Sequence, residues 1–152
     1  MSLGTDLAVV PYLVAHDAAE VDLVPRARVV ARPRPGEPRE TIDLAVMSER
    51  ENLAQALILR LLTPRGSLRE LGHAQYGSRL HEIIGERKND ALRNLCRAFV
   101  LEVVAQEPRV DDQAVALEFD PLAETATSFV FQLSVRPRDG GQPVEVALEV
   151  SL

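Results

Sequence analysis

Hydrophobic and polar residues alternate along the last third of the chain, which is the pattern of half-buried β-strands. The alternation runs through residues 115–119, 129–136 and 144–150. Residues 138–141, Arg-Asp-Gly-Gly, tolerate the positive φ angles of a tight turn and separate the second run from the third. We therefore predict an antiparallel meander of three strands, covered on one face by helices. The last strand is expected to leave one edge unpaired.

The middle of the chain has the helical period instead. Leu53, Leu57 and Leu61 recur at the spacing of one helix face, and Ser48 and Glu51 have the spacing of a capping box. A helix is therefore expected to begin at Ser48. Residues 63–66, Thr-Pro-Arg-Gly, are expected to end it.

A second, longer helix is expected after Asn89 or Asp90, because either residue is a suitable N-cap. Hydrophobic residues recur through this segment at helical spacing. The buried face is predicted to consist of Leu92, Leu95, Cys96, Phe99, Val103 and Val104.

Between the two helices, Ser78 is predicted to cap a short third helix. Leu80, Ile83 and Ile84 are expected to point inward from it, and Gly85 is expected to end it. The fold class is therefore α+β, a small single domain with two to three helices packed on a C-terminal three-stranded antiparallel β-meander.

The N-terminal part of the chain carries weaker signals. Residues 7–10, 27–31 and 41–46 are candidate short strands. Residues 32–39 contain three prolines and one glycine, which predicts an exposed, basic turn. We expect residues 1–40 to form an N-terminal extension with short strands and a Pro/Arg-rich loop.

The second long helix stops abruptly at Glu107-Pro108-Arg109, because proline cannot continue a helix. Helix C-termini favour cations, so a glutamate at this position needs a compensating partner. That partner is either Arg109 or a group outside the chain. If the segment is extended, Glu107 and Arg109 point to the same side. An acid and a base paired on a fixed corner are suited to docking, and a salt bridge that only closes the corner is the alternative.

Composition narrows the class of protein. The 152 residues are 46% hydrophobic and 26% charged, which is typical of one globular domain, and no stretch reaches the length of a membrane span. The first residues lack the features of a secretory signal, and the single cysteine, Cys96, cannot form an intrachain disulfide. We therefore expect cytoplasmic synthesis. The net charge of −6 argues against general nucleic-acid binding.

A glycosidase needs two carboxylates in a sugar-binding cleft, one of them with a raised pKa. Glu70, Glu82 and Glu107 are the candidates, but none lies in a sequence that specifies such a cleft. The chain has no tryptophan and two tyrosines, which provides little surface for stacking on sugar rings. Muramidase activity is therefore the alternative to a non-enzymatic role rather than the main hypothesis.

Other catalytic readings have less support. Ser67 with His73, or Ser78 with His81, lacks the nucleophile elbow and an acid to orient the imidazole. The histidines and the single cysteine lack the spacing of a zinc site, and Gly66, Gly72 and Gly77 are not spaced as a phosphate-binding loop. We expect no cofactor, no metal and no catalytic residues. Tyr76 is expected to anchor its loop on the helices.

Three stretches together carry a resemblance to a known family. Residues 53–66, residues 72–80 and the Glu107-Pro108-Arg109 triplet resemble, in order and spacing, the baseplate wedge family of contractile tails. This family includes the sheath initiator of T-even phage baseplates, the corresponding subunit of type VI secretion baseplates, and equivalents in extracellular contractile injection particles and R-type tailocins. The match implies that residues 41–152 form a sheath initiator-like domain with a small α+β fold.

The resemblance also implies partners. In the family the Glu-Pro-Arg triplet contacts the helical core bundle of the large wedge proteins, which places Glu107, Pro108 and Arg109 in that contact here. The family's terminal sheet offers an edge to the sheath protein, so residues 133–136 and the last strand are expected to face the sheath. The edge residues are Val144, Glu145, Val146, Ala147, Leu148, Glu149 and Val150. Six copies in each particle are implied, with tube-side baseplate proteins as further candidates for the basic N-terminal tract.

Overall fold

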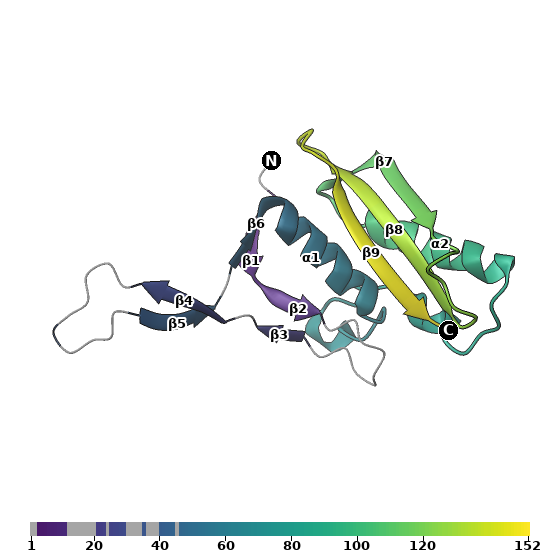
Figure 1. Ribbon diagram of the computed structural model, residues 1–152, viewed down its shortest axis with the longest axis horizontal. Helices are drawn as coiled ribbons and strands as arrows, with labels where there is room; N and C mark the ends of the chain where they lie inside the picture. Colours follow the sequence, from purple (N-terminus) through teal and green to yellow (C-terminus); the bar gives the residue numbers. More distant parts are fainter. Residues whose placement is uncertain (1–2, 12–20, 24, 30–34, 36–39, 45) are drawn as a thin grey trace.

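The last third of the chain forms an antiparallel sheet in the computed structural model, which describes residues 3–11, 21–23, 25–29, 35, 40–44 and 46–152. Strands β7 (Val110–Phe119), β8 (Ser128–Pro137) and β9 (Val144–Ser151) lie in the order β7-β8-β9 (Figure 1). Gly140, with a φ of 80°, lies in the turn between β8 and β9. The predicted meander is confirmed.

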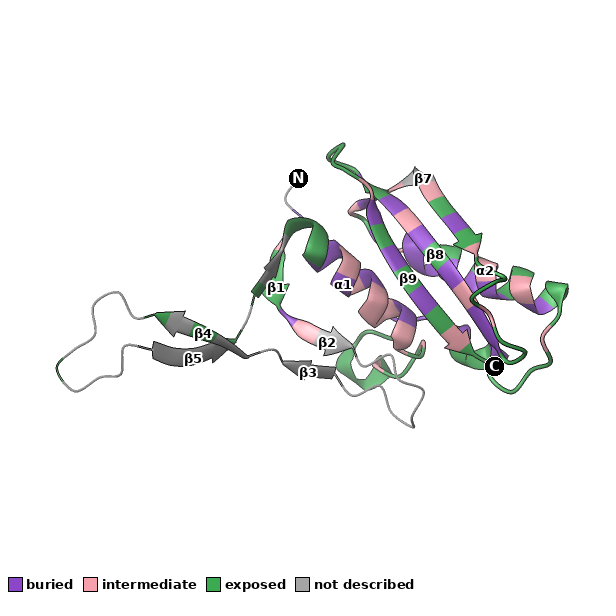
Figure 2. Ribbon diagram, in the orientation of Figure 1, coloured by how far each residue is buried: buried purple, intermediate pink, exposed green. Residues whose placement is uncertain are grey.

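The two faces of this sheet have different environments. Phe129, Phe131 and Leu133 of β8 are buried, while Gln132 between them is exposed. In β9, Val144, Val146 and Leu148 are buried and alternate with exposed residues, as the colours of Figure 2 show. The period-two pattern of the sequence therefore identifies the buried face correctly.

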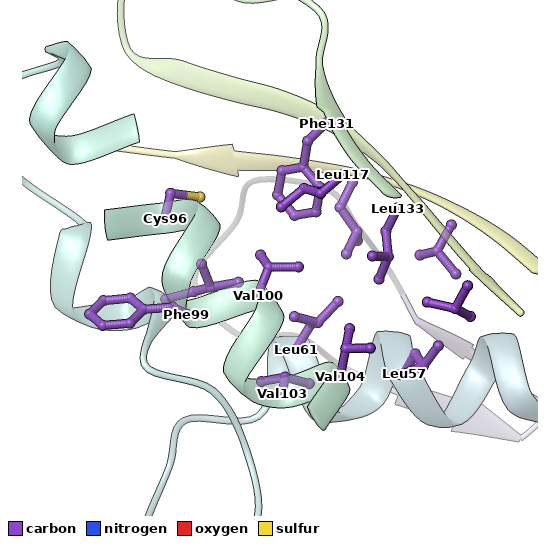
Figure 3. Close-up of a cluster of buried hydrophobic side chains, with 14 of the residues drawn as sticks. Leu57, Leu61, Cys96, Phe99, Val100, Val103, Val104, Leu117, Phe131 and Leu133 are labelled. Carbon is purple, nitrogen blue, oxygen red and sulfur yellow. The ribbon is translucent and has the colours of Figure 1, made fainter. Parts of the chain in front are cut away.

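Helices α1 (Glu49–Leu62) and α2 (Asp90–Ala105) cover the buried face. The side chains of both helices meet those of the sheet in one hydrophobic core, part of which is drawn in Figure 3. Asn89 caps α2, because its Oδ1 accepts a hydrogen bond from the Leu92 backbone N–H at 2.8 Å. The expected capping box at α1 depends on the side chain of Ser48, which lies outside the described side chains.

Two residues expected in the core are exposed. Leu95 of α2 is 42% exposed, because the buried stripe of the helix runs through Leu92, Cys96 and Phe99 and Leu95 lies beyond its edge. Ile84 is 61% exposed. The short helix η2 (Leu80–Ile83) has ended before it, and its extended backbone turns the side chain away from the buried positions Leu80 and Ile83.

Backbone hydrogen bonds fix the loop after α1. The Ser78 N–H donates to Thr63 O and the Arg65 N–H donates to Ser78 O, both at 2.8 Å. Gly77 has a φ of 106°, and a Cβ at this position would lie 2.4 Å from Thr63 O, so only glycine fits. The helix η2 begins at Leu80, and the predicted cap Ser78 lies two residues before it, where its Oγ accepts a hydrogen bond from the Leu80 N–H at 3.3 Å. The Ser78 hydroxyl also donates to Leu61 O at 2.6 Å and holds the end of α1.

The N-terminal segment forms short antiparallel pairs. The predicted strand at residues 7–10 is divided in two, and so is the one at residues 41–46. The pairs are β1 (Thr5–Leu7) with β6 (Val46–Ser48), β2 (Val9–Pro11) with β3 (Val21–Leu23), and β4 (Pro25–Val29) with β5 (Glu40–Leu44). Figure 1 shows that β4 and β5 project away from α1. The predicted turn at residues 32–39 lies outside the described residues, except for Pro35.

The N-terminal segment contacts α1 through two buried side-chain amides. Gln55 of α1 accepts a hydrogen bond from the Val9 N–H at 2.9 Å and donates to Leu7 O at 2.8 Å. Asn52 donates to Leu3 O at 3.0 Å. These side-chain amides bond to backbone groups of the N-terminal segment and hold it on α1.

Candidate partner-binding surfaces

The corner at Glu107-Pro108-Arg109 is a turn rather than an extended segment. The Glu107 N–H donates to Val104 O at 3.0 Å and continues the end of α2. The Val110 N–H donates to Glu107 O at 3.1 Å, which closes the turn before β7 begins. The helix ends and a strand begins at this corner, as predicted, but the extended alternative for the segment is not found. The proline is accommodated in the turn, where its missing N–H is not needed.

The acid and the base of this corner nevertheless pair with each other. Arg109 Nε donates to Glu107 Oε1 at 2.7 Å, and Arg109 Nη2 donates to Glu107 Oε2 at 3.1 Å. The Glu107 side chain is 4% exposed and that of Arg109 is 22% exposed. Two parallel hydrogen bonds of this kind form a strong, directional ion pair. Of the two compensating partners considered for Glu107, the structure supplies the one within the chain.

A second arginine supports Glu107 from α1. Arg60 Nη2 lies 3.9 Å from Glu107 Oε2. Burial opposes ionisation of the glutamate, but the hydrogen bonds and charge of Arg109, together with the charge of Arg60, outweigh it and hold the pKa of Glu107 below its usual value. Glu107 is therefore a permanently charged structural group at neutral pH.

The same two arginines connect the corner to distant parts of the chain. Arg109 Nη1 donates to Leu3 O at 2.8 Å. The guanidinium carbon of Arg60 lies 4.9 Å from the centre of the Tyr76 ring, a cation–π contact. Tyr76 therefore anchors its loop on α1, as predicted. The corner joins the N-terminal segment, α1, the Tyr76 loop and the start of the sheet.

What the corner presents to solvent is limited. Pro108 is exposed, and part of the Arg109 side chain is accessible. The carboxylate of Glu107 is not at the surface. The contribution of Arg60 has no signal in the sequence, because nothing in its position within α1 indicates a neighbour so far along the chain.

The β9 strand provides the second predicted surface. Among the described residues β9 is paired with β8 alone, in a register that places Phe131 opposite Leu148. Glu145, Ala147 and Glu149 are exposed, as predicted. The other edge of β9 lies toward α1, which runs alongside it in Figure 1. Sequence reasoning did not place a helix there.

The three candidate catalytic carboxylates lie in different surroundings. Glu70 is exposed on the short helix η1 (Arg69–Leu71). Glu82 is exposed and accepts two hydrogen bonds from Arg79, each at 2.8 Å, which lower its pKa. Glu107 is buried in its ion pair. A general acid needs a raised pKa, whereas the pKa values of Glu82 and Glu107 are both lowered.

Other reactive side chains are occupied or isolated. Ser78 holds α1, and His73 and His81 are exposed. Cys96 is fully buried, and burial raises the pKa of its thiol to about 12, so it is a core residue. Within the described ranges, no three His, Cys, Asp or Glu residues gather as a metal site would require. No helix in that part of the chain combines the length and the hydrophobicity needed to cross a membrane.

Comparison with solved structures finds a likeness in fold. A protein from Geobacter sulfurreducens, described as a suspected tail lysozyme, superposes with a TM-score of 0.56 and 18% sequence identity. The alignment covers 67% of this chain and 89% of that protein. At this identity the likeness shows a common fold. No family model matches the chain, and no curated protein matches it.

Proposed function

We propose that this protein is a structural baseplate subunit of a contractile tail or injection machine, which links the wedge core bundle to the first sheath ring and initiates sheath assembly. The observation that carries the proposal is the α+β fold ending in an edge strand, in a chain whose fold resembles that of a protein described as tail-associated. The sequence motifs of the baseplate wedge family support the same role.

The corner provides a rigid surface for the wedge. Pro108 and Arg109 lie on a turn. The ion pairs of Glu107 with Arg109 and Arg60 hold this turn in place. A side chain that is already ordered loses little further entropy when it binds. In this role Glu107 acts as a positioning residue that orients Arg109, and the partner helices contact Pro108 and the accessible part of Arg109.

The β9 edge provides the surface for the sheath. A strand of a partner protein would pair with main-chain groups of β9, and such pairing depends little on the side chains of either strand. This property suits the start of a repeating sheath. Glu145 and Glu149 are exposed beside this edge, where they can meet basic sheath residues, and Glu145 Oε2 also accepts a hydrogen bond from Gln132 Nε2 at 3.2 Å.

The description of the structural neighbour favours a second candidate, a cell-wall-degrading hydrolase of the muramidase type. Its test is direct. The purified protein is incubated alone with peptidoglycan, and release of reducing ends is measured for the natural chain and for the Glu82→Gln and Glu70→Gln variants. The structural role predicts no release. Release that either variant abolishes would establish the hydrolase.

The docking site is tested with an exposed residue, so that folding is preserved. Pro108→Glu adds a negative charge beside Arg109 without removing an observed contact. Pro121→Glu, in an exposed loop after β7, is the matched control. In co-purification from cells that express the baseplate and sheath genes, Pro108→Glu should lose the wedge proteins roughly tenfold, as expected for a misplaced charge in an interface. The Pro121→Glu variant should retain them. Equal recovery of wedge proteins by both variants would contradict the assignment of the corner.

A further inference from the structure

The outer face of α2 carries an exposed apolar stripe. Leu95 and Leu101 are 42% and 39% exposed, and Ala91, Ala98 and Ala105 are exposed as well. Because a helix has about 3.6 residues per turn, these five positions lie in one band along its axis. The buried residues of α2 lie on the other side of the helix, in the core. α2 is therefore apolar on the face that it turns away from the sheet as well as on its buried face.

The residues of this stripe read the same from either end. Ala98 lies at the centre, Leu95 and Leu101 lie three residues to either side of it, and Ala91 and Ala105 lie seven residues to either side. If a second copy of α2 packs antiparallel on the first, with a two-fold axis at Ala98, each alanine lies at the level of an alanine and each leucine at the level of a leucine. An interface between two copies of one chain requires this self-complementarity.

The alternation of small and large side chains suits close packing of two helices. In such a pair, alanines form the central layer and the two outer layers, and leucines form the two layers between them. Alanine in the contact layers lets the helix axes approach to about 8 Å, the short end of the usual range. Leu95 of one copy and Leu101 of the other would then fill the two sides of each intervening layer.

Two polar residues beside the stripe favour the antiparallel orientation. Asn94 and Glu102 each lie four residues from Ala98, in opposite directions along the chain. The two-fold axis therefore brings Asn94 of one copy to the level of Glu102 of the other, where an amide N–H can donate to a carboxylate oxygen. Glu102 also pairs with Arg65 of its own chain, and its two oxygens can accept both donors. A parallel pair would bring the two Glu102 carboxylates together instead.

We propose that the free protein forms a reversible antiparallel dimer through α2, and that a second copy of this chain is the occupant of the stripe. The stripe spans fourteen residues from its first alanine to its last, which is about 21 Å of helix. Such a contact is smaller than the roughly 1,200 Å² that stable interfaces bury. The dimer is therefore weak, with a dissociation constant in the micromolar range or above.

The dimer has a consequence for assembly that rests on the proposed function. Ala105 lies three residues before Pro108, so a dimer through α2 covers surface next to the corner at which the wedge proteins are proposed to bind. Self-association and wedge binding would then compete. The dimer would cover the apolar face of the free subunit and would dissociate when the wedge proteins bind.

The dimer is tested by analytical ultracentrifugation from about 1 μM to about 1 mM protein. The natural chain should change from monomer to dimer within this range. Ala98→Glu brings two like charges together at the axis and should weaken self-association at least tenfold. Ala116→Glu makes the same change at an exposed alanine on the opposite face of the sheet and should have no effect. A natural chain that stays monomeric, or equal association of the two variants, would overturn the inference.

Cysteine cross-linking tests the orientation of the helices. Ala98→Cys places two thiols together at the axis, so mild oxidation should join the chains through a disulfide. The natural Cys96 is fully buried and does not compete. Ala91→Cys should cross-link to Ala105→Cys in a mixture of the two variants but not to itself, and Ala116→Cys measures the background from random collisions. Cross-linking of Ala91→Cys to itself above that background would indicate a parallel pair and would overturn the inference.

The outcomes also separate the dimer from the proposed function. The disulfide-linked Ala98→Cys dimer should recover wedge proteins roughly tenfold less well than its reduced form. Self-association as expected, in a chain that recovers neither wedge nor sheath proteins, would refute the function and retain the dimer. Recovery of both by a chain that stays monomeric at every concentration would retain the function and refute the dimer.

Discussion

The corner and the β9 edge differ in how many of their polar groups form hydrogen bonds or ion pairs within the chain. At the corner, Glu107 and Arg109 bond to each other and Arg109 Nη1 donates to Leu3 O, while the buried Nε of Arg60 has no hydrogen-bond partner among the described residues. At the β9 edge, no described strand pairs with the side of β9 that faces away from β8. Most polar groups of the corner are therefore paired within the chain, while in the proposed function the β9 edge is completed by a partner strand. This difference predicts that changes at the corner affect folding first and that changes at the edge affect association.

The largest effect is expected at Glu107. Glu107→Ala leaves Arg109 and Arg60 without their carboxylate in a mostly buried site, which should lower the free energy of unfolding by about 3 kcal/mol. Chemical denaturation measures the change. Pro108→Glu on the same turn should change stability by less than about 0.5 kcal/mol. A similar small value for Glu107→Ala would show that the corner does not support the fold.

Gly77→Ala should come next. The substitution places a methyl group 2.4 Å from Thr63 O at a positive φ, and we expect a loss of about 2 kcal/mol together with weaker contact between Tyr76 and Arg60. Gly72→Ala is the matched control, since its φ is also positive but nothing lies within 4 Å of the added carbon. Thermal unfolding of both variants separates crowding from backbone strain, and equal losses would exclude the close approach as the cause.

Acid should reduce the stabilisation that the ion pairs of Glu124 provide to the loop between β7 and β8. Hydrogen bonds from Arg93 and Lys88 lower the pKa of Glu124, whose side chain is 3% exposed, to about 2. Because the folded pKa lies below the ordinary value, the stabilisation is complete above about pH 4.5 and is lost as the pH falls toward 2. Glu124→Gln should cost roughly 1 kcal/mol at pH 7 and should flatten the acid limb of a stability–pH curve. An unchanged acid limb would contradict this assignment.

The smallest effect on folding is expected at the β9 edge. Glu149→Lys should change the free energy of unfolding by less than about 0.5 kcal/mol, because the side chain is exposed. The same variant should reduce recovery of the sheath protein in co-purification. A large loss of stability would show that the edge is structural and would remove the contrast with the corner.

Periodicity was sufficient to predict the meander, its buried face and the two helices, because burial of one face imposes a regular pattern on Phe129, Phe131 and Leu133. It failed at Leu95, which lies beyond the edge of the buried stripe of α2, and at Ile84, which follows the end of η2. The Glu107–Arg109 pair was considered from charge alone. The contribution of Arg60 and the position of α1 beside β9 could not be predicted, since both depend on how distant segments pack.

The most direct test of the central claim is a hydrogen-exchange map of β9 in the assembled particle compared with the isolated protein. Our account predicts that alternate amides between Val144 and Ser151 exchange rapidly in the isolated protein and become protected when sheath protein is added. It predicts no further change in the amides of residues 104–110 from that addition. Exchange of the β9 amides that is equally fast with and without sheath protein would contradict it.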